Sequence, residues 1–258
     1  MYLDEIIAAH RAAASSDKRA VDRLIGEAKS MPKPRRFREA LKVASGSHLA
    51  VIAEIKRRSP SKGNLNPDLD AGALAATYEG GGASCVSVLT DHDFFGGSAH
   101  DLETAARAIK LPVLRKDFTV SANDVCDARL MGADCLLLIV AALEFSELRD
   151  FYSLGKEIGL DVLVEVHTES ELEDALSVGA DMIGVNQRNL ATFVVDTEIA
   201  ARMSAKIPSS VVKVAESGVR GASDAKALRL ASYDAVLVGE SLVVSGDVRA
   251  KLNELLVG

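Results

Sequence analysis

Short apolar runs rich in β-branched residues recur along this chain, and most are followed by a segment with helical periodicity. Runs without polar alternation are typical of parallel strands buried on both faces. The candidate strands are 49–55, 84–89, 112–115, 134–140, 161–166, 181–185, 211–215 and 234–238. Eight strands alternating with helices predict an α/β fold, a (β/α)8 TIM barrel, and 258 residues suit one such barrel.

The segments between these runs support the same fold. Helical patterns cover 71–80, 100–109, 122–131, 144–158 and 169–177. Gly-Ala-Asp occurs at 132–134 and again at 179–181, each time between a helix and a strand, which indicates a repeated αβ unit. A doubly wound open sheet is the alternative. The even number of strands and the lack of a G-x-G-x-x-G fingerprint after any strand weaken it.

Residues 1–47 precede the first strand and carry their own helical pattern, with apolar residues at Leu3, Ile6 and Ile7 and again near Val21 and Leu24. We expect a helical extension that packs across the barrel within a single domain, 1–258. A basic cluster lies in this extension, at Lys33, Arg35, Arg36 and Arg38. Because the chain is acidic overall, a solvated helical face is favoured over a nucleic-acid site.

Charge and cysteine usage exclude several functions. The net charge of −7 disfavours nucleic-acid binding. The three cysteines show no CxxC spacing, and five scattered histidines show no metal-ligand spacing, so we expect neither disulfides nor a metal. No signal core or membrane-length apolar run is present. These features predict a cytoplasmic protein without membrane contact, and the lack of a distinct surface stripe favours a monomer.

Polar residues gather where the predicted strands end. Glu54 and Lys56 close the first strand, where they share one face with Ile52. The other groups in such positions are 115–117, Glu165, Asn186, Arg188, 216–218 and 239–241. The first halves of the strands carry few charges, with Lys213 as the exception. Since barrel enzymes place their chemistry at the carboxyl ends of the strands, we expect a catalytic top face and a structural bottom face.

Three of these residues could carry acid–base chemistry. Lys56, Lys116 and Glu165 should project toward one mouth of the barrel. A partly desolvated lysine beside other cations loses basicity and can act as a general acid near neutrality, and a buried carboxylate can act as the base. A lysine could equally form a Schiff base, and spacing alone does not separate the two roles.

Two glycine turns suggest a phosphate site. Ser217-Gly218 and Gly239-Glu240-Ser241 follow the last two predicted strands, where this type of barrel commonly binds phosphate through backbone N–H groups. The Glu240 side chain should then point away from the anion. The pair Phe94-Phe95 in a Gly-rich loop is either an apolar wall for a ligand or an anchor for the loop.

Longer motifs around these residues resemble the indole-3-glycerol phosphate synthase family. They extend over nearly the whole chain and are IAEIKRRSPS at 52–61, VLT at 88–90, FGGS at 95–98, PVLRKDF at 112–118, LLI at 137–139, LVEV at 163–166, IGVNQRNL at 183–190, VKVAESG at 212–218 and LVGESL at 237–242. The resemblance implies ring closure, decarboxylation and dehydration of 1-(2-carboxyphenylamino)-1-deoxyribulose 5-phosphate, with no cofactor or metal.

The resemblance also implies roles for individual residues. Lys116 would be the general acid of ring closure, Glu165 the base in dehydration, and Lys56 an assisting acid that also holds an anionic group. The sugar hydroxyls would be held by Glu54, Asn186 and Ser217. Substrate would also contact Ser59, Glu216, Gly218, Gly239 and Glu240 around the phosphate and sugar, Arg188 at an anionic group, and Phe95, Phe118 and Leu137 at the anthranilate ring.

Two other functions stay open at this stage. A phosphoribosylanthranilate isomerase would need a carboxylate and a thiol or similar pair, and no thiol is expected at the carboxyl end of a strand. A scaffold or sensor for a phosphorylated ligand would bind without turnover, and the apparent acid–base set argues against it.

Overall fold

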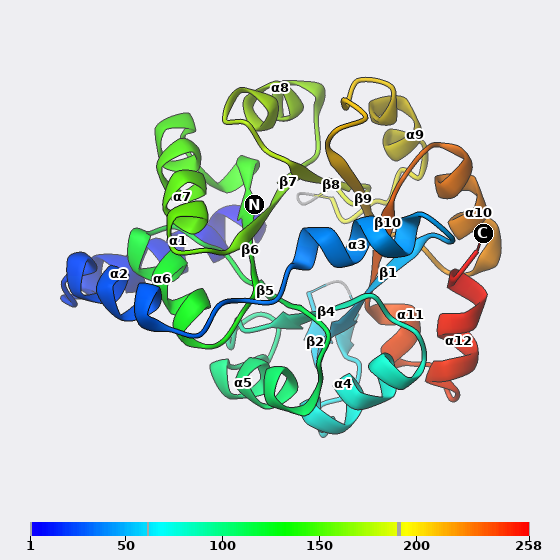
Figure 1. Ribbon diagram of the computed structural model, residues 1–258, viewed down its shortest axis with the longest axis horizontal. Coiled ribbons are helices and arrows are strands. Elements are labelled where there is room, and N and C mark those ends of the chain that lie inside the picture. Colours follow the sequence, from blue (N-terminus) through cyan, green and yellow to red (C-terminus); the bar gives the residue numbers. More distant parts are fainter. Residues whose placement is uncertain (1, 61, 190–191, 258) are drawn as a thin grey trace.

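The computed structural model describes residues 2–60, 62–189 and 192–257, so Ser61 and Leu190 of the motifs above lie outside the described residues. Eight parallel strands form a closed barrel in the order β1-β10-β9-β8-β7-β6-β5-β4 (Figure 1). The first strand pairs with both β10 and β4. The predicted TIM barrel is therefore confirmed, and the open doubly wound sheet is wrong.

Each barrel strand begins and ends within one residue of its predicted bounds. The strands are β1 Ala50–Ile55, β4 Cys85–Leu89, β5 Val113–Lys116, β6 Cys135–Ile139, β7 Asp161–Val166, β8 Met182–Asn186, β9 Val212–Glu216 and β10 Ala235–Val238. A short antiparallel pair, β2 Arg58–Ser59 and β3 Gly63–Asn64, follows β1 and was not predicted.

Helices surround the barrel in the order expected for an alternating fold. They are α4 Ala71–Gly80, α5 Ala99–Ala108, α6 Ala122–Leu130, α7 Phe145–Glu157, α8 Glu169–Ser177, α9 Glu198–Ser204, α10 Ala222–Leu230, α11 Glu240–Val243 and α12 Val248–Leu255, with a 3-10 turn at Val140–Ala142. Ser98, Ser121 and Thr168 cap α5, α6 and α8 by accepting a backbone N–H. Such caps define where these helices begin, directly after the loops at the carboxyl ends of the strands.

The core has two parts because side chains alternate along each strand. Val51, Ala53 and Ile55 point outward to the helices, whereas Ile52 points into the barrel. Aliphatic side chains such as Leu114 fill the interior, as the shortage of aromatic residues requires. The three buried cysteines are free.

Three helices form the N-terminal extension: α1 Tyr2–Ser16, α2 Val21–Ser30 and α3 Phe37–Ser45. Helix α3 lies across the amino end of the barrel (Figure 1), where Phe37 and Leu41 pack against the interior cluster. The predicted packing of the extension across the barrel is confirmed. The free cysteines Cys85 and Cys135 lie in the same cluster, as small buried side chains.

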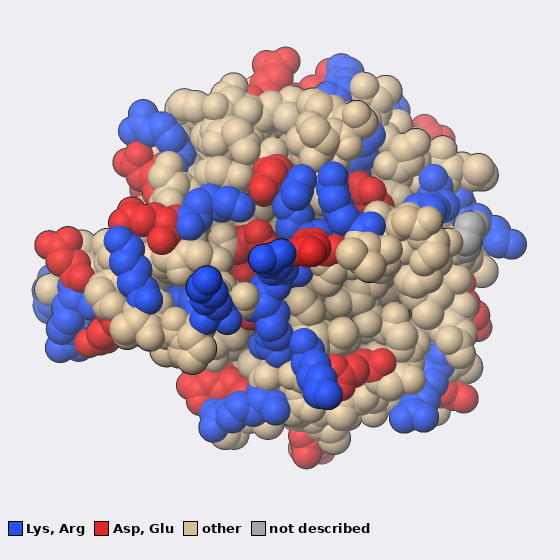
Figure 2. Space-filling view, viewed as in Figure 1, with Lys and Arg blue, Asp and Glu red and all other residues tan. Residues whose placement is uncertain are grey.

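The basic cluster of the extension is not simply a solvated helical face, and this prediction was wrong in part. Arg35 donates from its backbone N and its Nε to Asp134, each at 2.7 Å. The Arg38 backbone N donates to Asp161 at 2.9 Å. Figure 2, viewed toward α3, shows Lys and Arg interspersed with Asp and Glu. Lys33 and Arg36 are exposed, whereas Arg35 and Arg38 anchor the extension to the barrel.

The amino ends of the strands carry more charge than the sequence suggested, because carboxylates stand where strands begin. Asp134 accepts the Val113 N–H at 2.8 Å, and Asp234 accepts the Lys213 N–H at 2.9 Å. Asp181 lies 3.3 Å from Lys156 Nζ. The repeated Gly-Ala-Asp thus supplies acceptors at the bottom of the barrel, which is charged but structural.

No helix in the described ranges combines the length and the apolar character that crossing a bilayer requires.

Removing interior volume should destabilise the barrel. Leu163 is fully buried in the interior cluster, so Leu163→Ala should lower the free energy of unfolding by about 2–5 kcal/mol. Leu230 is 87% exposed, and Leu230→Ala should change it by no more than about 0.5 kcal/mol. Urea unfolding followed by circular dichroism measures both. Equal losses in the two variants would contradict the interior packing.

Candidate active site

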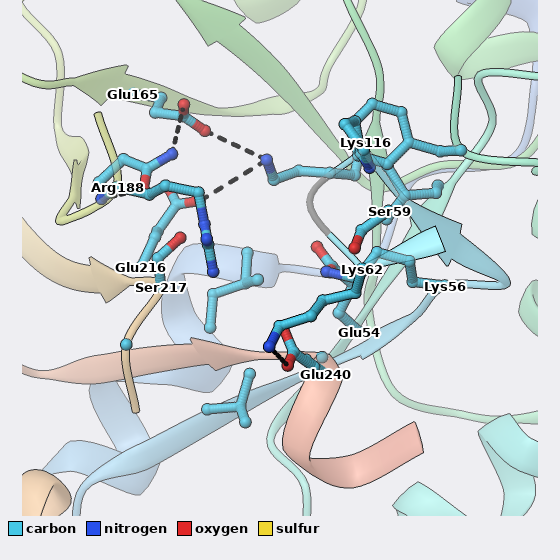
Figure 3. A pocket seen from close by; sticks show the side chains of 18 of the residues that line it. Glu54, Lys56, Ser59, Lys62, Lys116, Glu165, Arg188, Glu216, Ser217 and Glu240 are labelled. Atoms are coloured by element: carbon cyan, nitrogen blue, oxygen red, sulfur yellow. Dashed lines mark hydrogen bonds and ion pairs between the residues drawn. The ribbon is translucent and has the colours of Figure 1, made fainter. Parts of the chain in front are cut away.

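A cavity of about 970 Å³ opens at the carboxyl ends of the strands. All of the site residues expected from the sequence line it: Glu54, Lys56, Ser59, Phe95, Lys116, Phe118, Leu137, Glu165, Asn186, Arg188, Glu216, Ser217, Gly218, Gly239 and Glu240. Figure 3 shows several of them converging from different strands. The structure brings the predicted residues together, while their individual roles stay predictions.

Strand alternation explains why these side chains converge. Inward positions carry apolar residues deep in the barrel and polar residues at the mouth. Leu114 is followed two residues later by Lys116, Leu163 by Glu165, and Val214 by Glu216. Each series ends at the same level of the barrel, so the last inward side chain of every such strand faces the cavity.

The first strand contributes an ion pair at the cavity edge. Lys56 Nζ lies 2.7 Å from Glu54 Oε1, which confirms that the two side chains share a face. A Cβ at position 239 would lie 2.4 Å from Glu54 Oε1, so only glycine leaves room for this carboxylate. The turn after β10 and the ion pair on β1 therefore depend on each other.

Lys116 lies between two buried carboxylates. Its Nζ is 3.1 Å from Glu165 Oε2 and 3.7 Å from Glu216 Oε2 (Figure 3). Asn186 Nδ2 donates to Glu165 Oε1 at 3.0 Å. Glu165 and Glu216 are 1% and 2% exposed, so their charges act in a medium of low dielectric constant. The lysine and the two acids therefore titrate as one group.

The expectation that a catalytic lysine loses basicity is wrong for Lys116 in this substrate-free state. Burial lowers the pKa of its ammonium, but the charges of Glu165, Glu216 and Glu54 outweigh burial and leave the pKa above its ordinary value. The sequence suggested neighbouring cations, whereas the folded chain places carboxylates around the Nζ. Lys116 is therefore an ammonium at neutral pH, a proton donor rather than a free amine.

The two carboxylates differ in acidity. Burial raises the pKa of Glu165, but the Lys116 charge, the His167 ring and the Asn186 amide lower it more, so its pKa lies below the usual range. Burial and the neighbouring Glu165 charge raise the pKa of Glu216 to about 8. Glu165 is thus the ionised member and can accept a proton, while Glu216 is more readily protonated.

The two glycine turns follow β9 and β10, which lie across the closed barrel from β5 and β6. Ser217 and Gly218 have φ values of 64° and 78°, in the left-handed region. Gln187 Nε2 donates to the Ser217 carbonyl at 2.7 Å, which holds this turn in place. Among the described residues, the buried Ser59 Oγ has no hydrogen-bond partner, so it is available to a ligand in the cavity.

Aromatic residues form the apolar wall. The Phe95 and Phe118 rings are 6.3 Å apart between centroids, and both line the cavity with Leu137. Asp91 Oδ1 accepts the N–H groups of Phe94 and Phe95 at 2.7 and 2.8 Å, which holds the loop. The loop is therefore both anchored and part of the cavity wall, so both alternatives offered by the sequence apply.

Several cavity residues escaped the sequence reasoning, and four of them add charge or come from the N-terminal extension. Lys62 and Arg220 add cations, and Leu3 and Ile6 of α1 add apolar surface. Lys62 directly follows the recognised motif, so its position was a usable signal. For Leu3 and Ile6 there was none, because their contact with the cavity arises from docking of α1. Lys62 Nζ lies 3.9 Å from Glu240 Oε1 (Figure 3), so the lysine partly neutralises the Glu240 carboxylate beside the glycine turns.

Within the described ranges, one cluster has the spacing of metal ligands: His10, Asp91 and Asp117. Its oxygens already have partners, since Asp117 Oδ2 lies 2.9 Å from Arg115 Nη2 and Asp91 accepts two backbone N–H groups. His10 Nε2 lies 2.9 Å from Asp91 Oδ2. The geometry fits an ion pair that docks α1 beside the cavity better than a cation site.

Sequence comparisons with known proteins match this chain to one enzyme family. The family model described as indole-3-glycerol phosphate synthase matches residues 3–255. An indole-3-glycerol phosphate synthase from Mycolicibacterium vanbaalenii is 48% identical over 256 residues, which cover 98% of this chain and 93% of that protein. One from Chlorobium phaeovibrioides is 49% identical over 223 residues, 86% of each chain.

A solved structure of thiamine phosphate pyrophosphorylase from Pyrococcus furiosus has a TM-score of 0.60 and 16% sequence identity, covering 83% of this chain and 95% of that one. At this identity the likeness shows the barrel fold alone.

The docking of α1 should depend on pH through His10. Burial lowers the pKa of His10, but the hydrogen bond with Asp91 and the Asp117 charge outweigh it and raise the pKa. A histidine with a higher pKa in the folded state than in the unfolded state stabilises the fold fully at pH values below the unfolded-state pKa. This stabilisation is lost as the pH rises through the folded-state pKa. His10→Gln should therefore lower the free energy of unfolding by about 1 kcal/mol at pH near 5.5 and by less at pH near 9.

Urea unfolding at the two pH values measures this difference, with His100→Gln on the exposed face of α5 as the matched control. A loss that is independent of pH would contradict the charged His10 contact.

Proposed function

The chain belongs to the indole-3-glycerol phosphate synthase family, and we propose that its cavity converts 1-(2-carboxyphenylamino)-1-deoxyribulose 5-phosphate into indole-3-glycerol phosphate, carbon dioxide and water. The enzyme is a carbon–carbon lyase of tryptophan biosynthesis. The observation that carries the catalytic assignment is the position of the Lys116 ammonium between Glu165 and Glu216, inside a cavity that offers an apolar wall and two glycine turns.

The substrate has four chemical parts, and the cavity has a complement for each. The anthranilate ring would pack on Phe95, Phe118 and Leu137, and the phosphate would bind at the two glycine turns with help from Ser59. Arg188 and Lys56 would hold the carboxylate and other anionic groups. Glu54, Asn186, Glu216 and Ser217 would hold the sugar hydroxyls. In this proposed arrangement the ketone carbon would lie near Lys116.

Ring closure requires a proton donor at the ketone oxygen. The aryl carbon that bears the carboxylate attacks the ketone carbon, a carbon–carbon bond forms, and the carbonyl electron pair moves to oxygen. Lys116 would donate a proton to that oxygen. An alkoxide is far more basic than the neutral amine that Lys116 becomes, so a raised Lys116 pKa does not prevent the transfer and keeps the donor fully charged. Carbon dioxide then leaves, and its bonding electrons restore the aromatic ring.

Dehydration requires a base and an acid. Glu165, ionised beside Lys116, would remove a proton while Lys56 protonates the departing hydroxyl, so water leaves and the pyrrole ring forms. A Schiff base at Lys116 is disfavoured, because its raised pKa keeps the nitrogen protonated and without a free lone pair.

Among the described residues no cysteine lines the cavity, so the alternative isomerase chemistry lacks its thiol there. Cys85 and Cys135 are the first residues of β4 and β6, at the end of the barrel away from the cavity. A ligand sensor without turnover does not account for the buried acid–base cluster, because burying ionisable groups such as Lys116, Glu165 and Glu216 is unfavourable unless they are used or fully paired.

We further propose that the reaction needs no cofactor or metal, since proton transfers between side chains suffice for every step. The remaining expectations from the sequence stand as proposals of the same kind: one domain over 1–258, a cytoplasmic monomer, a phosphorylated small molecule as ligand, and no nucleic-acid partner. The net charge of −7 supports the last of these.

Loss of the Lys116 ammonium should nearly abolish turnover. Lys116→Ala should lower kcat by roughly two to four orders of magnitude, the usual effect of removing a general acid. Lys116→Arg keeps the positive charge but cannot release a proton near neutral pH, so it should be similarly impaired. The measurement is indole fluorescence during incubation with the substrate in the presence of a chelator.

Lys110→Ala is the matched control, because Lys110 is exposed and lies outside the cavity; its rate should equal that of the unchanged enzyme. Near-normal turnover by folded Lys116→Ala would refute the assigned role.

The phosphate should contribute strongly to catalysis. A substrate analogue that lacks the phosphate loses several charge-assisted hydrogen bonds, so its kcat/KM should fall by at least about 100-fold. Steady-state kinetics on both compounds tests this, with inorganic phosphate added to the analogue reaction as a check for partial rescue. An analogue that reacts as fast as the substrate would show that the glycine turns do not bind phosphate.

A further inference from the structure

One ionisable side chain next to the catalytic carboxylate has no role so far. His167 directly follows β7, and its side chain is 12% exposed. Its Nε2 lies 3.3 Å from Glu165 Oε1, and its Nδ1 lies 3.1 Å from Glu171 Oε2 in the first turn of α8. The ring does not line the cavity, so any effect on a bound substrate would have to pass through Glu165.

Glu171 holds this histidine at two points. Its Oε2 accepts the His167 backbone N–H at 2.8 Å as well as contacting the ring nitrogen. Its own backbone N–H donates to the Thr168 cap of α8 at 3.2 Å. The imidazole is therefore fixed to the beginning of a helix, and its free motion toward or away from Glu165 is restricted.

Both ring nitrogens face carboxylate oxygens, and only the imidazolium form can donate to both. A neutral ring would direct a lone pair at one of the two carboxylates. Burial lowers the pKa of His167, but the contacts with Glu165 and Glu171 outweigh burial and raise the pKa to about 10. The buried Nε2 has no well-aligned hydrogen bond within the described part of the chain, so this contact has room to tighten when substrate binds.

We propose that His167 is a positioning residue for the reaction assigned above. As an imidazolium clamped to α8 by Glu171, it holds Glu165 Oε1 and keeps that carboxylate ionised, which leaves Oε2 directed at Lys116 and the substrate. This inference rests on the proposed function, because it assigns His167 to the base of that reaction.

The surrounding charges explain why a second cation is needed. The charged or polar groups that face Glu165 and His167 are Lys116 from β5, Asn186 from β8, Glu216 from β9 and Glu171 from α8, with Glu54 from β1 beyond Lys116. Glu165 and Glu216 would share a single cation if His167 were uncharged. One carboxyl would then retain a proton more readily, and the supply of ionised Glu165 would fall.

The test compares pH profiles of kcat for the full enzyme, His167→Gln and Glu171→Gln, with His100→Gln as the matched control. Turnover needs ionised Glu165, so it falls as pH drops through the pKa of that group. Removing the imidazolium raises this pKa and should shift the acidic limb of the profile to higher pH. We expect His167→Gln to lower kcat roughly 10- to 100-fold, the usual effect of losing a residue that orients a functional side chain, with KM changing less than about threefold.

Glu171→Gln keeps the ring but removes one of its two charged partners, so the imidazolium should lose its proton at lower pH. Its kcat should fall because the ring no longer holds Glu165 Oε1 in place, and nitrogen-15 NMR should show His167 losing its proton below the pH of about 10 expected for the unchanged enzyme. His100→Gln should leave the profile unchanged. Profiles of His167→Gln and Glu171→Gln that match the unchanged enzyme would overturn the proposal.

A second measurement does not depend on turnover or on the folding of His167→Gln. Nitrogen-15 NMR of the substrate-free enzyme should show both ring nitrogens of His167 protonated at a pH near 8, far above the ordinary histidine pKa. A neutral tautomer at that pH would overturn the proposal even if the enzyme is active. Absence of indole formation by the unchanged enzyme would instead refute the proposed function, and the NMR result would still report the clamp.

Discussion

Closure of the sheet between β1 and β10 is the constraint on which the rest of the molecule depends. A closed parallel sheet has no edge, and it brings the carboxyl ends of all eight strands around one opening. Each inward series of side chains then changes from apolar to polar at the same level. Residues far apart in the sequence, such as Glu54, Lys116 and Glu216, meet there without any one loop having to hold them.

The second constraint is charge balance in that buried layer. Glu165 and Glu216 lie almost fully out of water, and each needs a cation or a proton. Lys116 supplies one positive charge, and the His167 ring behind Glu165 supplies another. Because these groups interact through a low dielectric medium, a change at one of them alters the protonation of the others. The acidity of the general acid and the base is thus a property of the cluster.

Much of the fold and site was predictable because the relevant signals are local. Continuous apolar runs marked the barrel strands to within one residue, and polar residues at their ends marked the cavity. The errors share one cause, which is that electrostatic surroundings are set by residues distant in sequence. Lys116 was expected among cations and lies among carboxylates, and Arg35 was expected in solvent and binds Asp134. Docking of α1 likewise brought Leu3 to the cavity without a local signal.

The sequence by itself determined the number and order of the strands, which of their faces point inward, and the set of polar groups that could meet at the mouth. These follow from the two-residue period of a strand and from motifs that lie within single elements. Only the tertiary structure decided which charges become neighbours, which of them are buried, and therefore which carboxyl is ionised. Distances across the barrel, such as those from Lys116 to Glu165 and to Glu216, exist only once the sheet has closed.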